Sequence, residues 1–115
     1  MNTRIADNVT LCTSTWKKGT GLMFRFPKGC FAYIFPFKKP QRLTITMWFV
    51  FYSIDILFLD EDNLVVQTTS LRPFSNYVLP MKAIIFIELP FGTIQKHDVS
   101  VGQKIFWSKD FVDLL

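Results

Sequence analysis

The sequence predicts a mainly β fold, barrel-like or sandwich-like, with about seven short strands and one or two short helices. Short apolar runs rich in aromatic and β-branched residues, which favour strands, alternate with glycine, proline, asparagine and aspartate, which favour turns. Half of the 115 residues are hydrophobic and 13 are phenylalanine, so we expect an aromatic core. A chain of this length is expected to form a single domain over residues 1–115.

The first half of the chain contains three clear strand signals. They lie at Val9–Cys12, Phe31–Phe35 and Thr44–Tyr52, with a further segment released by Gly21 at Leu22–Phe26. A short helix is expected over Trp16–Lys18, because Gly19 follows it as a stop signal. Pro36 is expected to end the strand before it, and Lys38–Arg42 is expected to be an exposed basic loop.

The second half contains four more strand signals. They lie at Ile54–Leu59, Leu64–Thr68, Ala83–Leu89 and Lys104–Trp107. Asp60–Asn63 predicts a tight turn that joins the first two strands as a hairpin, since aspartate and asparagine tolerate turn geometry. Leu71–Leu79 is expected to be a loop, and Thr93–His97 is expected to form one helical turn.

The apolar run Met47–Asp62 contains one internal acid, Asp55. Strand alternation along this run places Met47 and Asp55 on one face, and both faces are apolar, which predicts a central strand covered on two sides. Burying an unpaired charge costs several kcal/mol, so Asp55 must be paired, protonated or functional.

Several motifs occur in a characteristic order along the chain. They are Gly21-Leu22-Met23-Phe24-Arg25, the aromatic strand Phe31–Phe35, Met47 through Asp60, Ile87–Gly92 and Val101–Ile105. On these motifs the chain resembles the DUF192 family of small bacterial and archaeal proteins, and Phe49–Tyr52 resembles its archaeal branch. The resemblance implies a mainly β fold with one or two short helices, and it implies no established activity.

The partner expected for Asp55 is Arg25, because the two residues end the two most distinctive motifs. An arginine can bind a carboxylate through two hydrogen bonds and offset part of its desolvation. We favour a structural role for Asp55, satisfied by this ion pair or by backbone N–H groups. A general base or a ligand-contacting carboxylate is the functional alternative.

These expectations favour a non-catalytic binding or interaction module as the function. If a ligand pocket exists, we expect Arg25 and Asp55 to be its polar groups, with Met23, Met47 and Phe49 lining it. An open cleft that exposes Asp55 would instead favour a hydrolase-like enzyme with Arg25 as its anion anchor.

A weak single-stranded nucleic-acid binder is the third candidate. Tyr33 and Phe35 alternate on one strand near Lys38 and Lys39, which could provide stacking faces beside positive charge. The net charge of +4 is mild and no basic run of five residues occurs, so core packing is the favoured explanation and nucleic acid is an unlikely partner.

Other classes of site find little support. Cys12, Cys30 and His97 are too few for a four-ligand zinc site, and no glycine-rich phosphate loop is present, so no metal or cofactor is expected. The apolar run Ile45–Leu59 has fifteen residues, fewer than the roughly 18–20 of a membrane span. The first ten residues lack an apolar signal region, which predicts a cytoplasmic protein. The partner, a small molecule or a protein, and the oligomeric state stay open.

Overall fold

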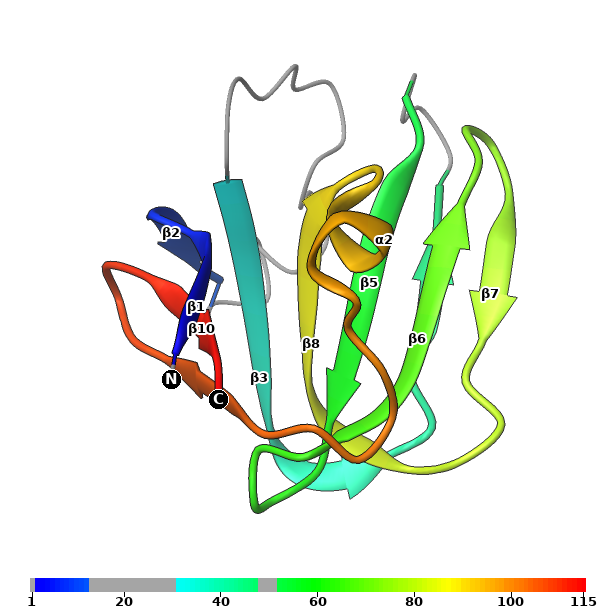
Figure 1. Cartoon of the computed structure of the whole chain (residues 1–115). Helices are drawn as coiled ribbons and strands as arrows, with labels where there is room; N and C mark the ends of the chain where they lie inside the picture. The colour runs from blue at the N-terminus through cyan, green and yellow to red at the C-terminus, as the bar shows by residue number, and fades with distance from the viewer. Residues whose placement is uncertain (1, 13–30, 48–51) are drawn as a thin grey trace.

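The computed structural model describes residues 2–12, 31–47 and 52–115, and within them the chain forms ten strands and one helix in three sheets (Figure 1). The strands are β1 (Thr3–Ala6), β2 (Asn8–Leu11), β3 (Phe31–Gln41), β4 (Thr44–Thr46), β5 (Ile54–Leu59), β6 (Val65–Leu71), β7 (Asn76–Val78), β8 (Ala83–Pro90), β9 (Ile105–Trp107) and β10 (Val112–Leu114). The helix α2 spans Thr93–His97. The predicted mainly β, sandwich-like class is confirmed.

The central sheet has the strand order β2-β3-β8-β5-β6. β2 runs parallel to β3, and all other neighbours in this sheet are antiparallel. β8 lies in the middle, hydrogen-bonded to β3 on one side and to β5 on the other. Every residue of β5 is buried, as expected for a strand covered on both faces.

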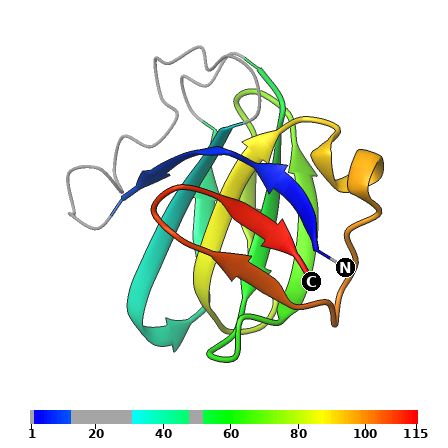
Figure 2. The same cartoon turned by 60° about the vertical axis from the view of Figure 1, so that its left-hand side comes forward.

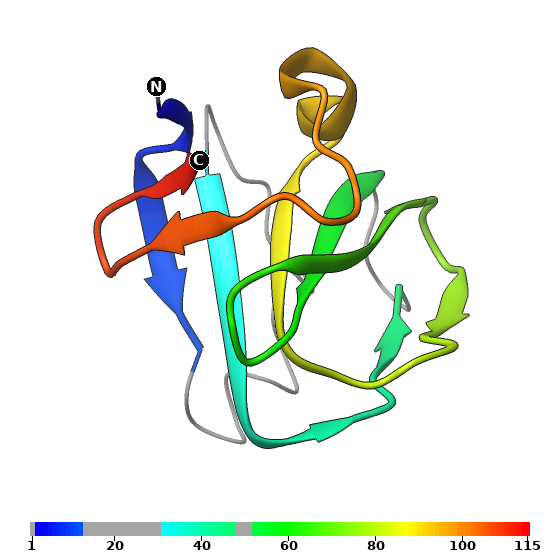
Figure 3. The same cartoon turned by 60° about the horizontal axis from the view of Figure 1, so that its bottom comes forward.

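Two smaller sheets cover the two faces of the central sheet. The three-stranded sheet β1-β10-β9 crosses one face, and Figure 2 shows it in front of the central strands with the two termini close together. The β4-β7 pair covers the other face and lies at the right of Figure 3, away from β1 and β10. The central sheet is thus the middle layer of three.

Each face of the central sheet has its own hydrophobic core. The aromatic cluster, shared with β4 and β7, contains Cys12, Phe31, Tyr33, Phe35, Leu43, Ile45, Met47, Ile54, Ile56, Phe58, Leu71, Leu79, Ala83 and Phe86. The aliphatic cluster, shared with β1, β9 and β10, contains Ile5, Ala6, Ala32, Ile34, Leu57, Leu59, Val65, Ile85, Ile87, Leu89, Val99, Ile105, Val112 and Leu114. Alternation along each strand sends successive side chains into opposite clusters.

Several predicted elements are confirmed, and others need correction. The strands β2, β5, β6, β8 and β9 and the helical turn α2 occur where the sequence predicted them. β1, β7 and β10 were not predicted, because each has only three or four residues and carries polar side chains among its apolar ones. The helix expected at Trp16–Lys18 and the segment Leu22–Phe26 lie outside the described residues.

Pro36 does not end the strand that contains it. β3 continues to Gln41, and its ladder with β8 shifts register between Pro36 and Gln41. A proline, which lacks an N–H, is tolerated at such an irregularity. The basic residues Lys38 and Lys39 are exposed as predicted, but they lie on this strand and not in a loop.

The strand predicted over Thr44–Tyr52 is also shorter than expected. β4 ends at Thr46 and pairs with β7, so it belongs to a different sheet from β5. Residues 48–51 lie outside the described part of the chain. In the part that is described, no helix combines the length and the hydrophobicity that a membrane crossing requires.

Candidate functional site

Asp55 lies on β5 and is held by three hydrogen-bond donors. The hydroxyl of Ser70 donates to Oδ1 at 2.6 Å, and the backbone N–H groups of Gly92 and Ile94 donate to Oδ2 at 3.0 and 2.9 Å. The residue is only 1% exposed. Hydrogen bonds to an ionised carboxylate are among the stronger ones in proteins, so these contacts offset much of the cost of burial.

The register of the sheet explains how these donors reach Asp55. Ser70 on β6 is directly opposite Asp55, and Leu89 on β8 is opposite it on the other side. The chain turns immediately after β8, and Gly92 takes a φ of +95°, a left-handed conformation that favours glycine. This turn brings the first backbone N–H groups of α2 back over the carboxylate.

The surface beside Asp55 is only slightly hollowed. A hollow of about 130 Å³ is lined by Asp55, Ser70, Phe91, Gly92, Ile94 and Gln95. A second hollow of about 230 Å³ lies on the other side of Phe91, and His97 lines it. Both are smaller than the roughly 300–1,000 Å³ of a typical ligand pocket. Asp55 therefore borders a shallow hollow, is itself only 1% exposed, and is not the floor of an open cleft.

The structure places the predicted pocket residues in different environments. Arg25, Met23 and Phe49 lie outside the described residues, so the predicted Arg25–Asp55 ion pair stays a prediction. Met47 is buried in the aromatic cluster, whereas Asp55 points to the face of the aliphatic cluster. The structure does not bring these two together, because the chain changes sheets between β4 and β5 and strand alternation does not carry across that change.

A second buried acid, Glu88 on β8, has a very different environment. Its direct neighbours are Tyr33 on β3 and Ile56 on β5, which places it on the aromatic face of the central sheet. Its Oε2 is buried and has no hydrogen-bond partner among the described residues. Burial raises the pKa of Glu88 from 4.5 to about 8, so the side chain is mostly protonated at neutral pH.

Sequence reasoning missed Glu88, although the signal was present. The strand Ala83–Leu89 contains a single acid among isoleucine, phenylalanine and leucine, which is the pattern that drew attention to Asp55. The sequence could not tell which of the two acids finds hydrogen-bond donors. That difference depends on the turn after β8, which provides hydrogen-bond donors to Asp55, whereas Glu88 lies on the opposite face of the sheet.

The two acids cannot work as one catalytic pair. Ile56 is opposite Glu88, and Asp55 therefore points through the other side of the sheet. An enzyme that uses two carboxylates needs both to face the same substrate. In the described part of the chain, no group of three histidine, cysteine, aspartate or glutamate side chains could hold a metal ion.

The stacking surface considered for nucleic acid is not available on β3. Tyr33 and Phe35 are both buried in the aromatic cluster, and Phe35 stacks on Phe86 with ring centres 4.4 Å apart. Rings packed in this way cannot stack on bases, so the exposed Lys38 and Lys39 lack the aromatic platform that was considered with them.

Comparison with known families matches residues 2–107 to DUF192, described as an uncharacterized ACR. The chain belongs to the DUF192 family. This DUF192 protein is 38% identical over 103 residues to a UPF0127 protein of Pyrococcus abyssi, covering 90% of this chain and 83% of that one. A UPF0127 protein of Pyrococcus horikoshii is 33% identical over 99 residues, covering 86% of each chain. The resemblance carried by the sequence motifs is confirmed.

Solved structures share the fold of this DUF192 protein. A protein of unknown function from Novosphingobium aromaticivorans DSM 12444 aligns with a TM-score of 0.79 at 22% identity, covering 86% of this chain and 74% of that one. A transcription-regulator candidate from Sinorhizobium meliloti 1021 aligns with a TM-score of 0.77 at 21% identity, covering 92% and 80%. At these identities the likeness shows the fold alone.

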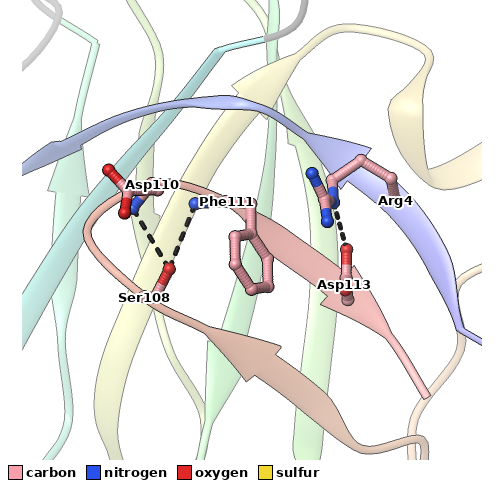
Figure 4. A network of polar contacts seen from close by, with 5 residues as sticks. All are labelled: Arg4, Ser108, Asp110, Phe111 and Asp113. Carbon is pink, nitrogen blue, oxygen red and sulfur yellow. Dashed lines mark hydrogen bonds and ion pairs between the residues drawn. The ribbon is translucent and has the colours of Figure 1, made fainter.

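Outside the two acids, the clearest polar network joins the ends of the chain. Figure 4 shows Arg4 of β1 beside Asp113 of β10, with the guanidinium 4.2 Å from the ring centre of Phe111. The hydroxyl of Ser108 accepts hydrogen bonds from the backbone N–H groups of Asp110 and Phe111. The Arg4 contacts join the two terminal strands, and the Ser108 contacts close the turn between β9 and β10, so both are structural.

Proposed function

We propose that this DUF192 protein is a non-catalytic binding module that recognises a small molecule at Glu88, on the aromatic face of its central sheet. The observation that carries the proposal is the contrast between its two buried acids. Asp55 accepts three hydrogen bonds, whereas Oε2 of Glu88 accepts none from the described residues. A buried polar atom without a partner needs an explanation, and a missing ligand is one of the few available.

The hydrolase alternative assigned the chemistry to Asp55. A general base must reach a proton on its substrate, and its oxygens must be free to accept that proton. Asp55 is 1% exposed and both of its oxygens are engaged, which argues for a positioning role in the fold. What supports the binding module here is that Asp55, the base which the hydrolase alternative needs, is buried and has both oxygens engaged.

The ligand is proposed to be a small molecule, because Glu88 is only 7% exposed and a protein side chain could not approach it broadly. Nucleic acid is disfavoured for a related reason: of the aromatic side chains of β3, Phe31, Tyr33 and Phe35 are buried and Phe37 is partly buried. A cytoplasmic location stays a prediction from the sequence.

The proposal is tested by NMR on the isotope-labelled protein with separate sets of small amines, carboxylates, amides and sugars. Binding at the proposed site is expected to shift the backbone amides of Tyr33, Ile56 and Glu88 first. If binders shift only the amides of Gly92 and Ile94, the site lies at Asp55 and the proposal is overturned.

A hydrolysis assay on p-nitrophenyl acetate and p-nitrophenyl phosphate tests the alternative. We expect that neither substrate is hydrolysed in a way that depends on Asp55, so Asp55→Asn should leave the rate unchanged. Turnover that disappears in this variant, while an Asp62→Asn control retains it, would establish an enzyme and contradict the proposal.

A further inference from the structure

We propose that the ligand of Glu88 is an organic ammonium ion, a protonated primary amine on an apolar body, whose N–H groups donate to the unpartnered oxygen of this carboxyl. The inference rests on the proposed function and adds the chemical class of the ligand.

The side chains around Glu88 favour a cation with an apolar body. Tyr33 lies directly opposite it, Phe86 precedes it on the same face of β8, and Phe35 stacks on Phe86. Aromatic rings attract cations through their negative faces, and the same faces repel anions. A carboxyl group among such rings therefore discriminates against carboxylates and phosphates and in favour of amines.

The described residues bury no positive charge beside Glu88. The buried charged residues of the described part are Asp55, Glu88 and Asp113, with no buried lysine, arginine or histidine among them. The aromatic cluster and its border in that part contain Cys12, Tyr33, Tyr52 and Tyr77 but no lysine, arginine or histidine. Burial alone accounts for the raised pKa of Glu88, in agreement with the missing cation.

A metal ion is a poorer candidate for the missing charge. Glu88 is the one buried carboxylate on this face within the described residues, and no group of three metal-binding side chains occurs among them. A divalent ion in a protein usually needs several oxygen, nitrogen or sulfur ligands. A primary ammonium needs one strong acceptor and tolerates aromatic neighbours.

The approach to Glu88 is narrow, which limits the size of the ligand. Glu88 is 7% and Tyr33 is 8% exposed, whereas Ile56 on the other side is fully buried. We infer that a ligand would have to approach from the side of β3 and that only a slender group would fit. An amino group on a methylene chain or on a benzyl group has this shape.

The protonation state of Glu88 gives the proposal a distinctive signature. At neutral pH the free protein holds Glu88 mostly as the neutral acid, and the bound ammonium would stabilise the carboxylate. Binding of the ammonium therefore releases the Glu88 proton to solvent. Affinity is expected to rise by roughly tenfold per pH unit below pH 8 and to level off above it.

The experiment uses benzylamine and its neutral isostere benzyl alcohol, measured by calorimetry at pH 6, 7 and 8 in two buffers of different ionisation enthalpy. We expect benzylamine to bind, to release close to one proton at the lower pH values, and to bind at least tenfold more tightly than benzyl alcohol. The variant Glu88→Gln is expected to weaken the binding of benzylamine by at least tenfold. Glu61→Gln, the same change in the exposed turn, is the matched control and should bind as the unmodified protein does.

A direct readout on the unmodified protein removes any dependence on how the variant folds. Benzylamine should shift the side-chain carboxyl carbon of Glu88 toward the value of a carboxylate at pH 7. Equal binding of benzylamine and benzyl alcohol, or no effect of benzylamine on this carbon, would overturn the ammonium assignment. If a neutral amide or a sugar then perturbs the same carbon, the binding module stands with another ligand class. If no small molecule does so, both proposals fail.

Discussion

Two acids on neighbouring strands occupy opposite faces of one sheet, and their hydrogen-bond surroundings give them different tasks. Asp55 accepts hydrogen bonds from Ser70 on β6 and from the backbone N–H groups of Gly92 and Ile94 at the start of α2. Glu88 lies among aromatic rings without a donor among the described residues. We expect the first acid to stabilise the fold, and we propose the second, whose pKa burial raises, as the ligand-binding group.

Removing the Asp55 carboxylate should destabilise the protein. Asp55→Ala leaves two backbone N–H groups and the Ser70 hydroxyl without their acceptor, at about 1–3 kcal/mol for each group left buried. Because the hollow beside Asp55 admits water, we expect a net loss of about 2–4 kcal/mol in the free energy of unfolding. Denaturant unfolding measures it. Asp62→Ala in the exposed turn is the control, expected to change stability by less than about 0.5 kcal/mol. Equal losses would show that Asp55 is no more important than a surface acid.

Glu88 should make stability depend on pH. Its pKa is 4.5 in the unfolded chain and about 8 in the folded protein, so between these values the folded state holds more protons. The contribution of Glu88 is fully present below pH 4.5 and is lost as pH rises to 8, by up to roughly 1.4 kcal/mol per pH unit. Glu88→Gln cannot titrate and should lack this slope. The difference between the two proteins in urea unfolding at pH 5 to 9 measures it, and parallel curves would contradict the raised pKa.

At the scale of elements, the decisive feature is the turn from β8 into α2. Residues Pro90 to Gly92 reverse the chain so that α2 lies over the end of β5, beside β1. The sequence predicted the turn and the helical residues Thr93–His97 correctly, because proline and glycine mark this position. It could not predict that the freed N–H groups point at Asp55, which depends on the register between β5 and β8.

Replacing Gly92 tests this coupling. Gly92 and Gly102 have φ angles of +95° and +96°, and a Cβ at either would meet nothing within 4 Å. Alanine at either position should therefore lower the free energy of unfolding by about 1–2 kcal/mol through backbone strain. Gly92→Ala should lose more than Gly102→Ala, because it also displaces a donor to Asp55. Thermal unfolding measures both, and the excess at Gly92 should vanish in an Asp55→Ala background, which removes the acceptor. An excess that persists there would show that the turn does not act through Asp55.

At the scale of the whole molecule, a central sheet is covered on both faces, and two separate cores follow from that arrangement. The strand class, the central position of β5 and the hairpin from β5 to β6 could be predicted from aromatic and β-branched runs and from the Asp60–Asn63 turn. The assignment of β4 and β7 to a second sheet could not, because local sequence does not specify which distant strand a short strand will join. That missed pairing also explains why Met47 was expected beside Asp55.

The layered arrangement predicts a ranking of local stability. Amide hydrogens in β3, β8 and β5 should exchange slowest, because each of these strands has neighbours on both sides and lies between two cores. Those of β4 and β7, which form an isolated pair, should exchange sooner. Hydrogen exchange followed by NMR measures the order. Slowest exchange in β9 or β10 would contradict a stability centred on the middle sheet.

Titration of the Glu88 side-chain carboxyl carbon by NMR in the folded, ligand-free protein tests most directly whether burial holds this acid neutral. We expect a midpoint near pH 8, because the acid is buried among aromatic side chains and the described residues bury no cation. A midpoint near 4.5, the value of a solvated glutamate, would contradict it and would remove the reason to assign a ligand to this acid.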